Sequence, residues 1–438
     1  MKPSRLSWPT GLRVWNQEEK VGEDGENGNR PVMGDIKPPL SGIRVLDLST
    51  FIAGPYTASI LGEFGADVIK VERPGTGDPM RQFGTPTERT DSSLAWLSEG
   101  RNKKSVTLDL KQPEGQALFR QLAEKSDVIC ENFRPGTLEK WNLGPVDLED
   151  GNEGLVWFRL TGYGQTGPYK DRPGFARIAH AVGGLTHLSG FPGETPVTPG
   201  STSLGDYISG LFGVIGVMMA LRHRDATGHG QIIDLALFES VFRMLDEIAP
   251  RYAREGTVRA PEGAGTVNAC PHGHFPTRDG KWIALACTTD KMFERLCRAM
   301  DHDDGNVGED LFKAYADQAT RLASQDSVIG TASRWTKSLD RDALMQVCID
   351  FEVPAGPINT IADIFDDPHF KARGMLTSMM LDDLGEIVVP APLPKLSKTP
   401  GEIRTLGPRL GEHNDEIYGG LLGISATALE KLKKNRVI

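Results

Sequence analysis

The sequence has few cysteines, no excess of positive charge and no long apolar run, and each of these absences disfavours a class of protein. Its five cysteines are odd in number and widely spaced, which fits a reduced compartment better than a disulfide framework. Lysine and arginine number 49 and aspartate and glutamate 59, so the formal net charge of −10 disfavours a nucleic-acid partner. The longest nearly apolar run, 208–221, is shorter than the roughly 20 residues that cross a bilayer, so it predicts a buried helix and no membrane partner.

Common catalytic motifs are missing as well. The chain has no Gly-x-Ser-x-Gly elbow and no Walker loop, and the turn after its first predicted strand is not Gly-x-Gly-x-x-Gly; hydrolases, NTPases and nicotinamide dehydrogenases are therefore disfavoured. The cluster Cys270-Pro-His-Gly-His274 has compressed spacing, so we expect no metal site. The N-terminus carries Lys2, Arg5 and Arg13 without the apolar stretch of a signal peptide. We expect a cytoplasmic protein, and the mitochondrial matrix stays open.

Strands and helices alternate from residue 43 onward. Successive β-branched strands with a helix between them need crossover connections, so the pattern predicts an α/β, doubly wound, Rossmann-like fold with a parallel sheet. We expect strands at 43–49, 66–72, 105–108, 127–130, 155–160 and 231–236, and helices at 55–64, 113–124, 206–224 and 238–248.

Changes in composition divide the chain into four segments. Residues 1–39 show no sustained period and predict an extended arm, and residues 40–250 form the first part of the large domain. Residues 251–385 are expected to form a smaller α+β domain with its linkers, and residues 386–438 to return to the large domain. Beyond residue 250 we expect strands at 281–287, 375–381 and 386–389 and helices at 290–300, 311–324 and 341–351.

Loops at the predicted strand ends are candidates for ligand binding, because ligands of parallel sheets lie beyond the carboxyl ends of the strands. Gly54 would let a phosphate or adenine group approach the backbone, and Arg73 beside Glu72 suggests a phosphorylated ribose. Residues 100–105 add three cations, and amides of the glycine-rich loop 161–168 are candidates for an oxyanion site. Plain turns and solvated basic loops explain the same residues, so both interpretations stay open.

Asp206 stands immediately before the apolar run. It suits the N-cap of the predicted helix, and a carboxylate at a helix N-terminus is held ionised by the dipole and nearby amides. An ionised carboxylate can attack an activated acyl group without a separate base. The structural and the catalytic roles are compatible.

Several ordered blocks together resemble one family. They include Pro39-Leu-Ser-Gly-Ile-Arg-Val-Leu-Asp-Leu48, Ala53-Gly-Pro55, Leu61-Gly-Glu-Phe-Gly-Ala-Asp-Val-Ile-Lys-Val-Glu-Arg-Pro-Gly75, Arg101-Asn-Lys-Lys-Ser105, Glu131-Asn-Phe-Arg-Pro-Gly136, Thr161-Gly-Tyr-Gly-Gln-Thr-Gly-Pro168, Gly205-Asp206 and Leu410-Gly-Glu-His413. From about residue 39 to its end the chain resembles the class III coenzyme A transferases, the group of formyl-CoA, carnitine and dicarboxylate CoA-transferases, with α-methylacyl-CoA racemase as a relative.

The resemblance implies a Rossmann-like large domain with a smaller α+β domain, in an interlocked homodimer. It implies that Asp206 is the nucleophile and that CoA is a co-substrate, with no tightly bound cofactor. It also implies CoA contacts from Phe51, Ile52, Ala53, Arg73, Leu108, Asp109, Leu110, Lys111, Asn132, Phe133 and Lys140.

The stretch around residue 175 departs from the family pattern. Phe175 stands where the racemase relatives carry a histidine, which disfavours racemisation. The family's acidic group is absent at Ala176, whereas Arg177 and His180 add potential positive charge. Our hypothesis is that this change suits a dicarboxylate whose second carboxylate needs a cation. Structural packing explains the same substitutions.

We therefore expect a CoA-transferase that moves CoA between small organic acids by way of an aspartyl mixed anhydride and an aspartyl-CoA thioester. Succinyl-CoA or another dicarboxylyl-CoA is the expected donor. Two alternatives stay open at this point: an acyl-CoA racemase or an isomerase that shifts CoA within one dicarboxylate, and a nucleotide-binding protein without catalysis.

Overall fold

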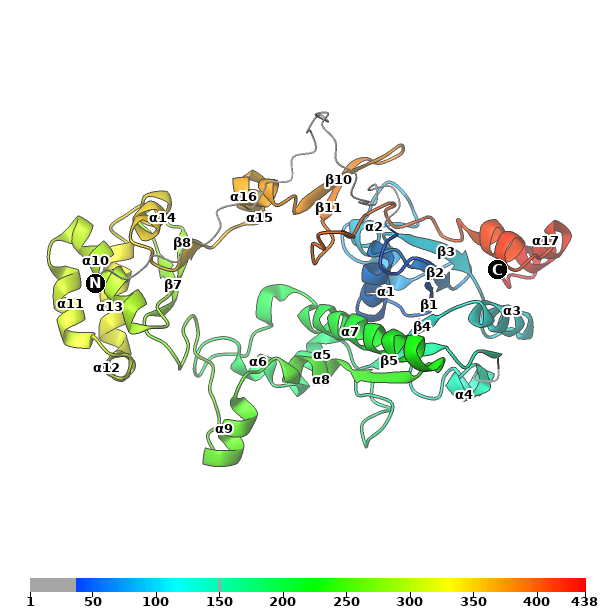
Figure 1. The fold of residues 1–438 in the computed structure, drawn as a ribbon, viewed down its shortest axis with the longest axis horizontal. Helices are drawn as coiled ribbons and strands as arrows, with labels where there is room; N and C mark the ends of the chain where they lie inside the picture. The colour runs from blue at the N-terminus through cyan, green and yellow to red at the C-terminus, as the bar shows by residue number, and fades with distance from the viewer. Residues whose placement is uncertain (1–36, 149–150) are drawn as a thin grey trace, which may run out of the picture. The chain divides into compact units, whose positions relative to one another are not determined.

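Six parallel strands form the central sheet of the structure, a computed structural model that describes residues 37–148 and 151–438 (Figure 1). They are β1 (Arg44–Asp47), β2 (Asp67–Glu72), β3 (Lys103–Thr107), β4 (Val128–Glu131), β5 (Val156–Thr161) and β6 (Ile232–Ala236). Their order, β3-β2-β1-β4-β5-β6, is that of a doubly wound sheet, so the predicted α/β fold is confirmed. Most of the predicted N-terminal arm, residues 1–36, lies outside the described residues.

Alternate residues of the strands point to opposite faces of the sheet and build two cores. Val45 and Val128 pack with the helices of one face, α1, α7 and α8. Their neighbours Leu46 and Ile129 pack with α3, η5 and α17 on the other face. The helices of this part of the chain are α1 (Ala53–Glu63), α2 (Leu94–Glu99), α3 (Pro113–Glu124), α4 (Pro145–Leu148), α5 (Ala176–Val182), α6 (Leu185–Leu188), α7 (Leu204–Thr227), α8 (Leu237–Arg243), α9 (Ile248–Glu255), the π-helical η5 (Asp415–Leu421) and α17 (Ala426–Lys434).

The C-terminal residues lie against the sheet beside β3. The Tyr418 hydroxyl donates to the Thr107 carbonyl at 2.8 Å, and the Asp109 amide donates to the Val437 carbonyl at 2.8 Å. Tyr418 and Val437 are fully buried. The last segment of the chain therefore completes the core of the large domain.

Residues 272–357 contain a second, antiparallel sheet with helices packed on it. Its order is β7-β8-β9, with β7 (His272–Pro276), β8 (Trp282–Ala286) and β9 (Ala355–Pro357). The helices are α10 (Asp290–Asp304), α11 (Val307–Tyr315), α12 (Gln318–Ala323), α13 (Gln325–Thr336) and α14 (Arg341–Asp350). They are followed by α15 (Ile361–Asp366), α16 (Pro368–Ala372) and an antiparallel hairpin of β10 (Leu376–Leu381) and β11 (Gly385–Pro390).

All five cysteines are free and buried. Cys130 lies in β4, and the other four belong to the core of the second sheet and its helices. Burial raises the pKa of Cys270 to about 11 and those of Cys287, Cys297 and Cys348 to about 12. These thiols act as small apolar side chains.

Two predicted helices are each broken into two. The predicted helix 238–248 is interrupted where Asp246 adopts a φ of +34°, and α8 and α9 lie on either side. The predicted helix 311–324 is interrupted before α12, because the Asp317 side chain accepts a hydrogen bond from the Thr320 amide and starts a new helix.

Helix α7 was expected to be buried, and only one side of it is. That side packs on α1 and β5, whereas Leu211, Ile215, Met218 and Met219 on the other side are between 42% and 67% exposed. By length and composition alone, α7 is the one described helix that could cross a membrane. Its packing on α1 and on the sheet shows that it contributes to the core of the large domain.

Candidate active site

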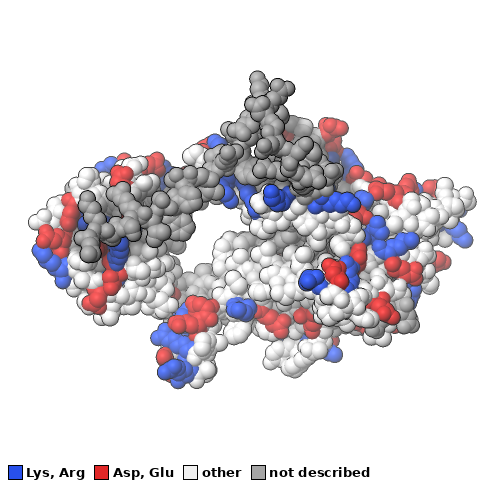
Figure 2. Space-filling model, viewed as in Figure 1, with Lys and Arg blue, Asp and Glu red and all other residues white. Residues whose placement is uncertain are grey.

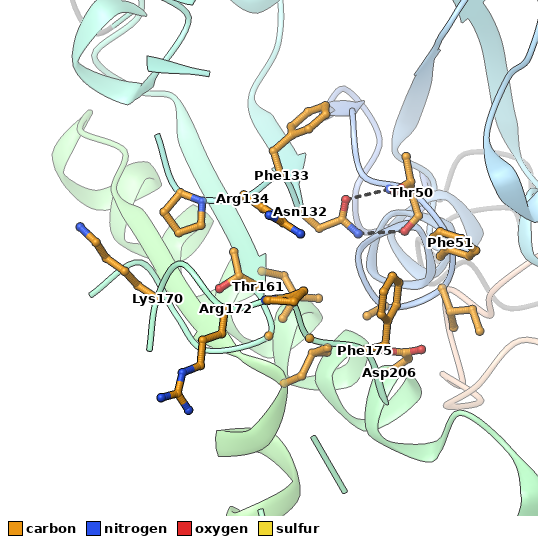
Figure 3. A pocket seen from close by; sticks show the side chains of 18 residues that line it. Thr50, Phe51, Asn132, Phe133, Arg134, Thr161, Lys170, Arg172, Phe175 and Asp206 are labelled. Atoms are coloured by element: carbon orange, nitrogen blue, oxygen red, sulfur yellow. Dashed lines mark hydrogen bonds between the residues drawn. The ribbon is translucent and has the colours of Figure 1, made fainter. Parts of the chain in front are cut away.

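The loop after β1 forms one wall of a cleft at the carboxyl ends of the strands. Phe51 in this loop has a φ of +64°, which is uncommon for a residue other than glycine. Its amide donates to Asp78 Oδ1 at 3.0 Å. Asn132, which follows β4, accepts from the Thr50 amide at 2.9 Å and donates to the Thr50 carbonyl at 2.8 Å (Figure 3). Asp78 and Asn132 therefore hold the loop in one conformation.

A fully buried group of charges lies beneath this loop. The Lys70 ammonium is 3.0 Å from Asp78 and 3.7 Å from Asp47, and the Lys103 ammonium is 2.9 Å from Asp47. Burial alone would raise the pKa of Asp47, but the two ammonium groups lower it below its ordinary value. Lys70 also donates to the Ser49 carbonyl. The network joins β1, β2 and β3 to the loop and makes that wall of the cleft rigid.

Asp206 lies in the first turn of α7, at the edge of the cleft. The sequence suggested that it caps the helix, but the N-cap position belongs to Ser203, whose carbonyl accepts from the Asp206 amide at 2.9 Å. The sequence also suggested that the helix would keep this carboxylate ionised. Burial instead raises the pKa of Asp206 to about 7, because desolvation of the charged form outweighs the favourable end of the helix. A carboxylate with this pKa is more basic than an ordinary aspartate and still substantially ionised at neutral pH.

His180 fixes the start of α7 beside Asp206. Its Nε2 accepts a hydrogen bond from the Gly205 amide at 2.7 Å, and the ring is fully buried. Burial, and secondarily the charge of Arg177, lower the pKa of His180. A nitrogen that accepts this bond carries no proton, so the ring is neutral and cannot supply the cation that the sequence suggested at this position. Its proton is on Nδ1, which has no partner among the described residues.

The first cleft, of about 210 Å³, has Asp206 at one end. Phe175 packs edge-on against Phe51 beside it, with 5.8 Å between ring centroids (Figure 3). Three cations also line this cleft: Arg134, Lys170 and Arg172. The side chains of Lys170 and Arg172 point away from Asp206, and the Arg172 guanidinium stacks on Tyr169 at 3.6 Å from the ring centroid. The cleft thus has an aromatic end with a carboxylate and a basic end.

A second cleft, of about 340 Å³, shares the side chain of Ile52 with the first. Ser203, the N-cap of α7, and Tyr207, which follows Asp206 in sequence, line the second cleft. The full lining is Ile52, Phe83, Ala176, Arg177, His180, Thr198, Ser201, Thr202, Ser203 and Tyr207. Asp206 itself lines only the first cleft, and its neighbour in sequence, Tyr207, lines the second.

Comparison with known proteins decides the family. A family model described as CoA-transferase family III matches residues 40–414. The chain belongs to this family. It is 53% identical to the succinyl-CoA:L-malate CoA-transferase alpha subunit of Chloroflexus aurantiacus, over 98% of this chain and 100% of the relative, and 54% identical to a beta subunit of that name from the same species, over 91% and 98%.

A solved structure agrees with this assignment. That of a CaiB/BaiF family protein from Brucella suis has a TM-score of 0.77 and 34% sequence identity, and the match covers 88% of this chain and 100% of that chain. The protein is a class III CoA-transferase, an enzyme, which excludes the alternative of a nucleotide-binding protein without catalysis.

The transferase brings some of the predicted CoA-binding residues together in the first cleft and leaves others outside it. Those that line it are Phe51, Ile52, Ala53, Asn132 and Phe133. The remaining ones lie outside: Arg73, Lys111 and Lys140 are exposed, Asp109 is half-buried, and Leu108 and Leu110 are buried in the core. For Leu108 and Leu110, only the main chain is available to a ligand.

Two of the regions proposed as ligand sites contain charged side chains that form ion pairs within the chain. Arg101 and Lys103 are buried in ion pairs with Glu63 and Asp47, so two of the three cations of 100–105 are neither solvated nor available to a phosphate. Likewise, Glu72 Oε1 forms a buried ion pair with Arg81 Nη2 at 2.6 Å, so this carboxylate is not available to bind a ribose.

Two glycine-containing turns are explained by packing. A Cβ on Gly54 would lie 2.4 Å from the Ser49 Cβ, so this glycine permits a close approach within the chain. In the loop 161–168, the Gly164 amide donates to Thr161 at 2.8 Å and the Gln165 amide to Asp234 at 3.0 Å. These two amides are therefore unavailable to an oxyanion.

Sequence reasoning missed part of the lining of both clefts. Arg134 lies in the stretch 131–136 without a pattern that marks it as a cleft residue, and Lys170 and Arg172 follow a glycine-rich turn with no pattern of their own. The hydroxyl-bearing stretch 198–203 has no sequence pattern that indicates a binding site either. In each case the residue lies in a loop whose position depends on contacts with distant elements.

Proposed function

We propose that this transferase moves CoA from succinyl-CoA to a small dicarboxylate acceptor such as malate, with Asp206 as the covalent carrier. The observation that carries the proposal is the position of Asp206: a partly buried carboxylate with a pKa of about 7 that lines the first cleft, next in sequence to Tyr207 of the second cleft. The relatives named as succinyl-CoA:L-malate transferase subunits support the choice of donor and acceptor.

The first half of the reaction loads CoA onto the enzyme. A carboxylate oxygen of Asp206 attacks the thioester carbonyl, the carbon–sulfur bond breaks, and CoA thiolate leaves a mixed anhydride behind. The thiolate then attacks the Asp206 carbonyl carbon and breaks its bond to the shared oxygen. Free succinate leaves, and Asp206 carries CoA as a thioester.

The second half reverses these steps with a new acid. The acceptor carboxylate attacks the Asp206 thioester and expels the thiolate, which forms a second mixed anhydride. The thiolate attacks the acceptor's acyl carbon, and the Asp206 carboxylate is released unchanged. No proton is gained or lost, and the thioester's activation is conserved only if water is kept away. Phe51, Ile52 and Phe175 supply apolar side chains to the cleft that contains Asp206, and a bound acyl-CoA would cover them.

The same geometry supports an arrangement for CoA. The five predicted residues in the first cleft would contact the pantetheine arm near Asp206, and Arg134, Lys170 and Arg172 at its basic end suit phosphate groups. Phe175 offers no proton-transfer group beside Asp206, which disfavours the racemase alternative.

We also propose that the active form is a dimer. The exposed apolar side of α7 carries Leu211, Ile215, Met218 and Met219, and Figure 2 shows few charged side chains over this helix. A surface of this kind on a soluble enzyme marks a protein interface. The expected partner is a second copy of the chain. The similarity to both alpha and beta subunits makes a related chain the alternative partner.

Trapping the aspartyl intermediate tests the proposed function. The full chain is incubated with succinyl-CoA, treated with hydroxylamine and digested with a protease, and the peptide masses are measured by mass spectrometry. We expect a hydroxamate at Asp206, which Asp206→Ala loses together with turnover. Asp225→Ala, an exposed acid on the same helix, is the matched control and should keep both. Turnover by Asp206→Ala would refute the mechanism.

A further inference from the structure

We infer that the second cleft is the subsite for the distal carboxylate of the acyl group, with Arg177 as the residue that selects dicarboxylates over monocarboxylates. The inference rests on the proposed function, since it takes Asp206 to be the point of acyl transfer. It concerns the second cleft, which in this arrangement binds the acyl group and not CoA.

The two clefts divide the substrate at Asp206. Asp206 and Phe175 line the first cleft, and the residues next to them in sequence, Tyr207 and Ala176, line the second. An acyl-CoA whose thioester carbonyl lies at Asp206 and whose CoA occupies the first cleft therefore has its carbon chain at the mouth of the second. A volume of about 340 Å³ is within the range of small-molecule sites.

The lining of the second cleft is suited to an anion. Arg177 supplies a cation, and it makes no ion pair with any residue between 37 and 438 that the structure describes. Thr198, Ser201 and Thr202, which carry hydroxyl groups, line the same cleft, and none of the described lining residues carries a carboxylate. A guanidinium with free donors and neighbouring hydroxyls is a typical carboxylate site.

His180 adds a second, independent indication. The ring lines this cleft and is 1% exposed, and its Nδ1 donor has no partner among the described residues. Buried donors without a partner are rare in folded proteins, and a ligand is one common reason for them. The first turn of α7 also borders the cleft, and its positive end favours an anion there.

The first cleft offers no equivalent position near Asp206. Of its three cations, Lys170 and Arg172 point away from the carboxylate, and Arg134 extends toward Asn132 (Figure 3). A distal carboxylate placed there would compete with CoA for the same basic groups. The aromatic end, formed by Phe51 and Phe175, would leave such a carboxylate desolvated and unpaired.

Exchange kinetics with matched acids test this subsite. Unlabelled succinyl-CoA is mixed with isotope-labelled succinate or with succinamate, which keeps the length of succinate but replaces one carboxylate by an amide. Succinate must be an acceptor if succinyl-CoA is a donor, because each step is reversible. In a reaction of two half-steps, kcat/KM for the acceptor reports only on the half that starts from the loaded enzyme.

We expect the wild-type enzyme to prefer succinate to succinamate. Arg177→Gln should lower kcat/KM for succinate by roughly 10- to 100-fold and change succinamate by less than about 3-fold, in line with the loss of a charged hydrogen bond. Arg177→Lys should restore much of the preference. Arg254→Gln, an exposed arginine on α9, is the matched control and should behave as wild type.

Three results would overturn the subsite: equal use of both acids by the wild-type enzyme, an equal loss for both acids in Arg177→Gln, or an unchanged succinate rate in that variant. Each of them is distinguishable from failure of the proposed function. In the latter case the wild-type enzyme forms no Asp206 adduct with succinyl-CoA and exchanges no labelled succinate.

Discussion

Replacing Asp206 by asparagine should abolish CoA transfer and stabilise the folded protein at neutral and higher pH. Burial raises the pKa of Asp206 from 3.8 to about 7. One pKa unit corresponds to about 1.4 kcal/mol, so the ionised carboxylate costs up to about 4 kcal/mol of folding free energy. Asparagine has a similar shape and cannot ionise, so the variant avoids this cost.

The pH dependence gives the prediction its sign. The pKa of Asp206 is higher in the folded than in the unfolded chain. The free energy of unfolding of the wild-type protein therefore falls, relative to that of Asp206→Asn, as pH rises from the pKa of the unfolded chain to that of the folded chain. Between pH 5 and pH 7 the variant's advantage should grow by roughly 1.4 kcal/mol per pH unit and then level off. Urea unfolding followed by tryptophan fluorescence over this range measures it. Asp225→Asn, exposed on the same helix, should show no such trend. A difference between Asp206→Asn and wild type that is constant with pH would refute the reasoning.

Two further variants test the supports of the site. His180→Ala removes the acceptor of the Gly205 amide, so we expect kcat to fall at least 10-fold with a smaller change in KM. The free energy of unfolding should also fall by about 2 kcal/mol. Steady-state kinetics and urea unfolding measure these effects, and a wild-type kcat would show that this bond does not position Asp206. Asn132→Ala removes the hydrogen bonds to the Thr50 amide and carbonyl, so the KM for succinyl-CoA should rise several-fold while the fold is kept. An unchanged KM would show that the loop after β1 does not need these hydrogen bonds.

The sheet was predictable because its signals are local. Each strand is a short run of β-branched residues, and the intervening helices force parallel crossovers. Helix α3 begins and ends at the predicted residues, since Pro113 suits the first turn of a helix. The breaks at Asp246 and before α12 were missed because an apolar period continues through them.

The resemblance indicated five residues that line the first cleft, whereas Asp206 was also indicated by its place before the apolar run, and its catalytic role stays a prediction. The cations of 101–105 appear as a basic cluster in the sequence, but Arg101 and Lys103 are neutralised by Glu63 and Asp47, which lie on other elements. A local window contains neither partner. The second cleft was missed for the same reason, because α5, the loop 198–203 and α7 meet only in the folded chain.

The buried thiols make the enzyme convenient to assay. A disulfide reagent reacts with thiolates, and burial suppresses thiolate formation at Cys270, Cys287, Cys297 and Cys348 while their sulfur atoms stay shielded from the reagent. Free CoA, by contrast, is an ordinary small thiol. A chromogenic disulfide added to the native enzyme should therefore measure the CoA released by hydrolysis of the thioester, without a contribution from protein thiols. The same assay would identify variants that admit water to the cleft.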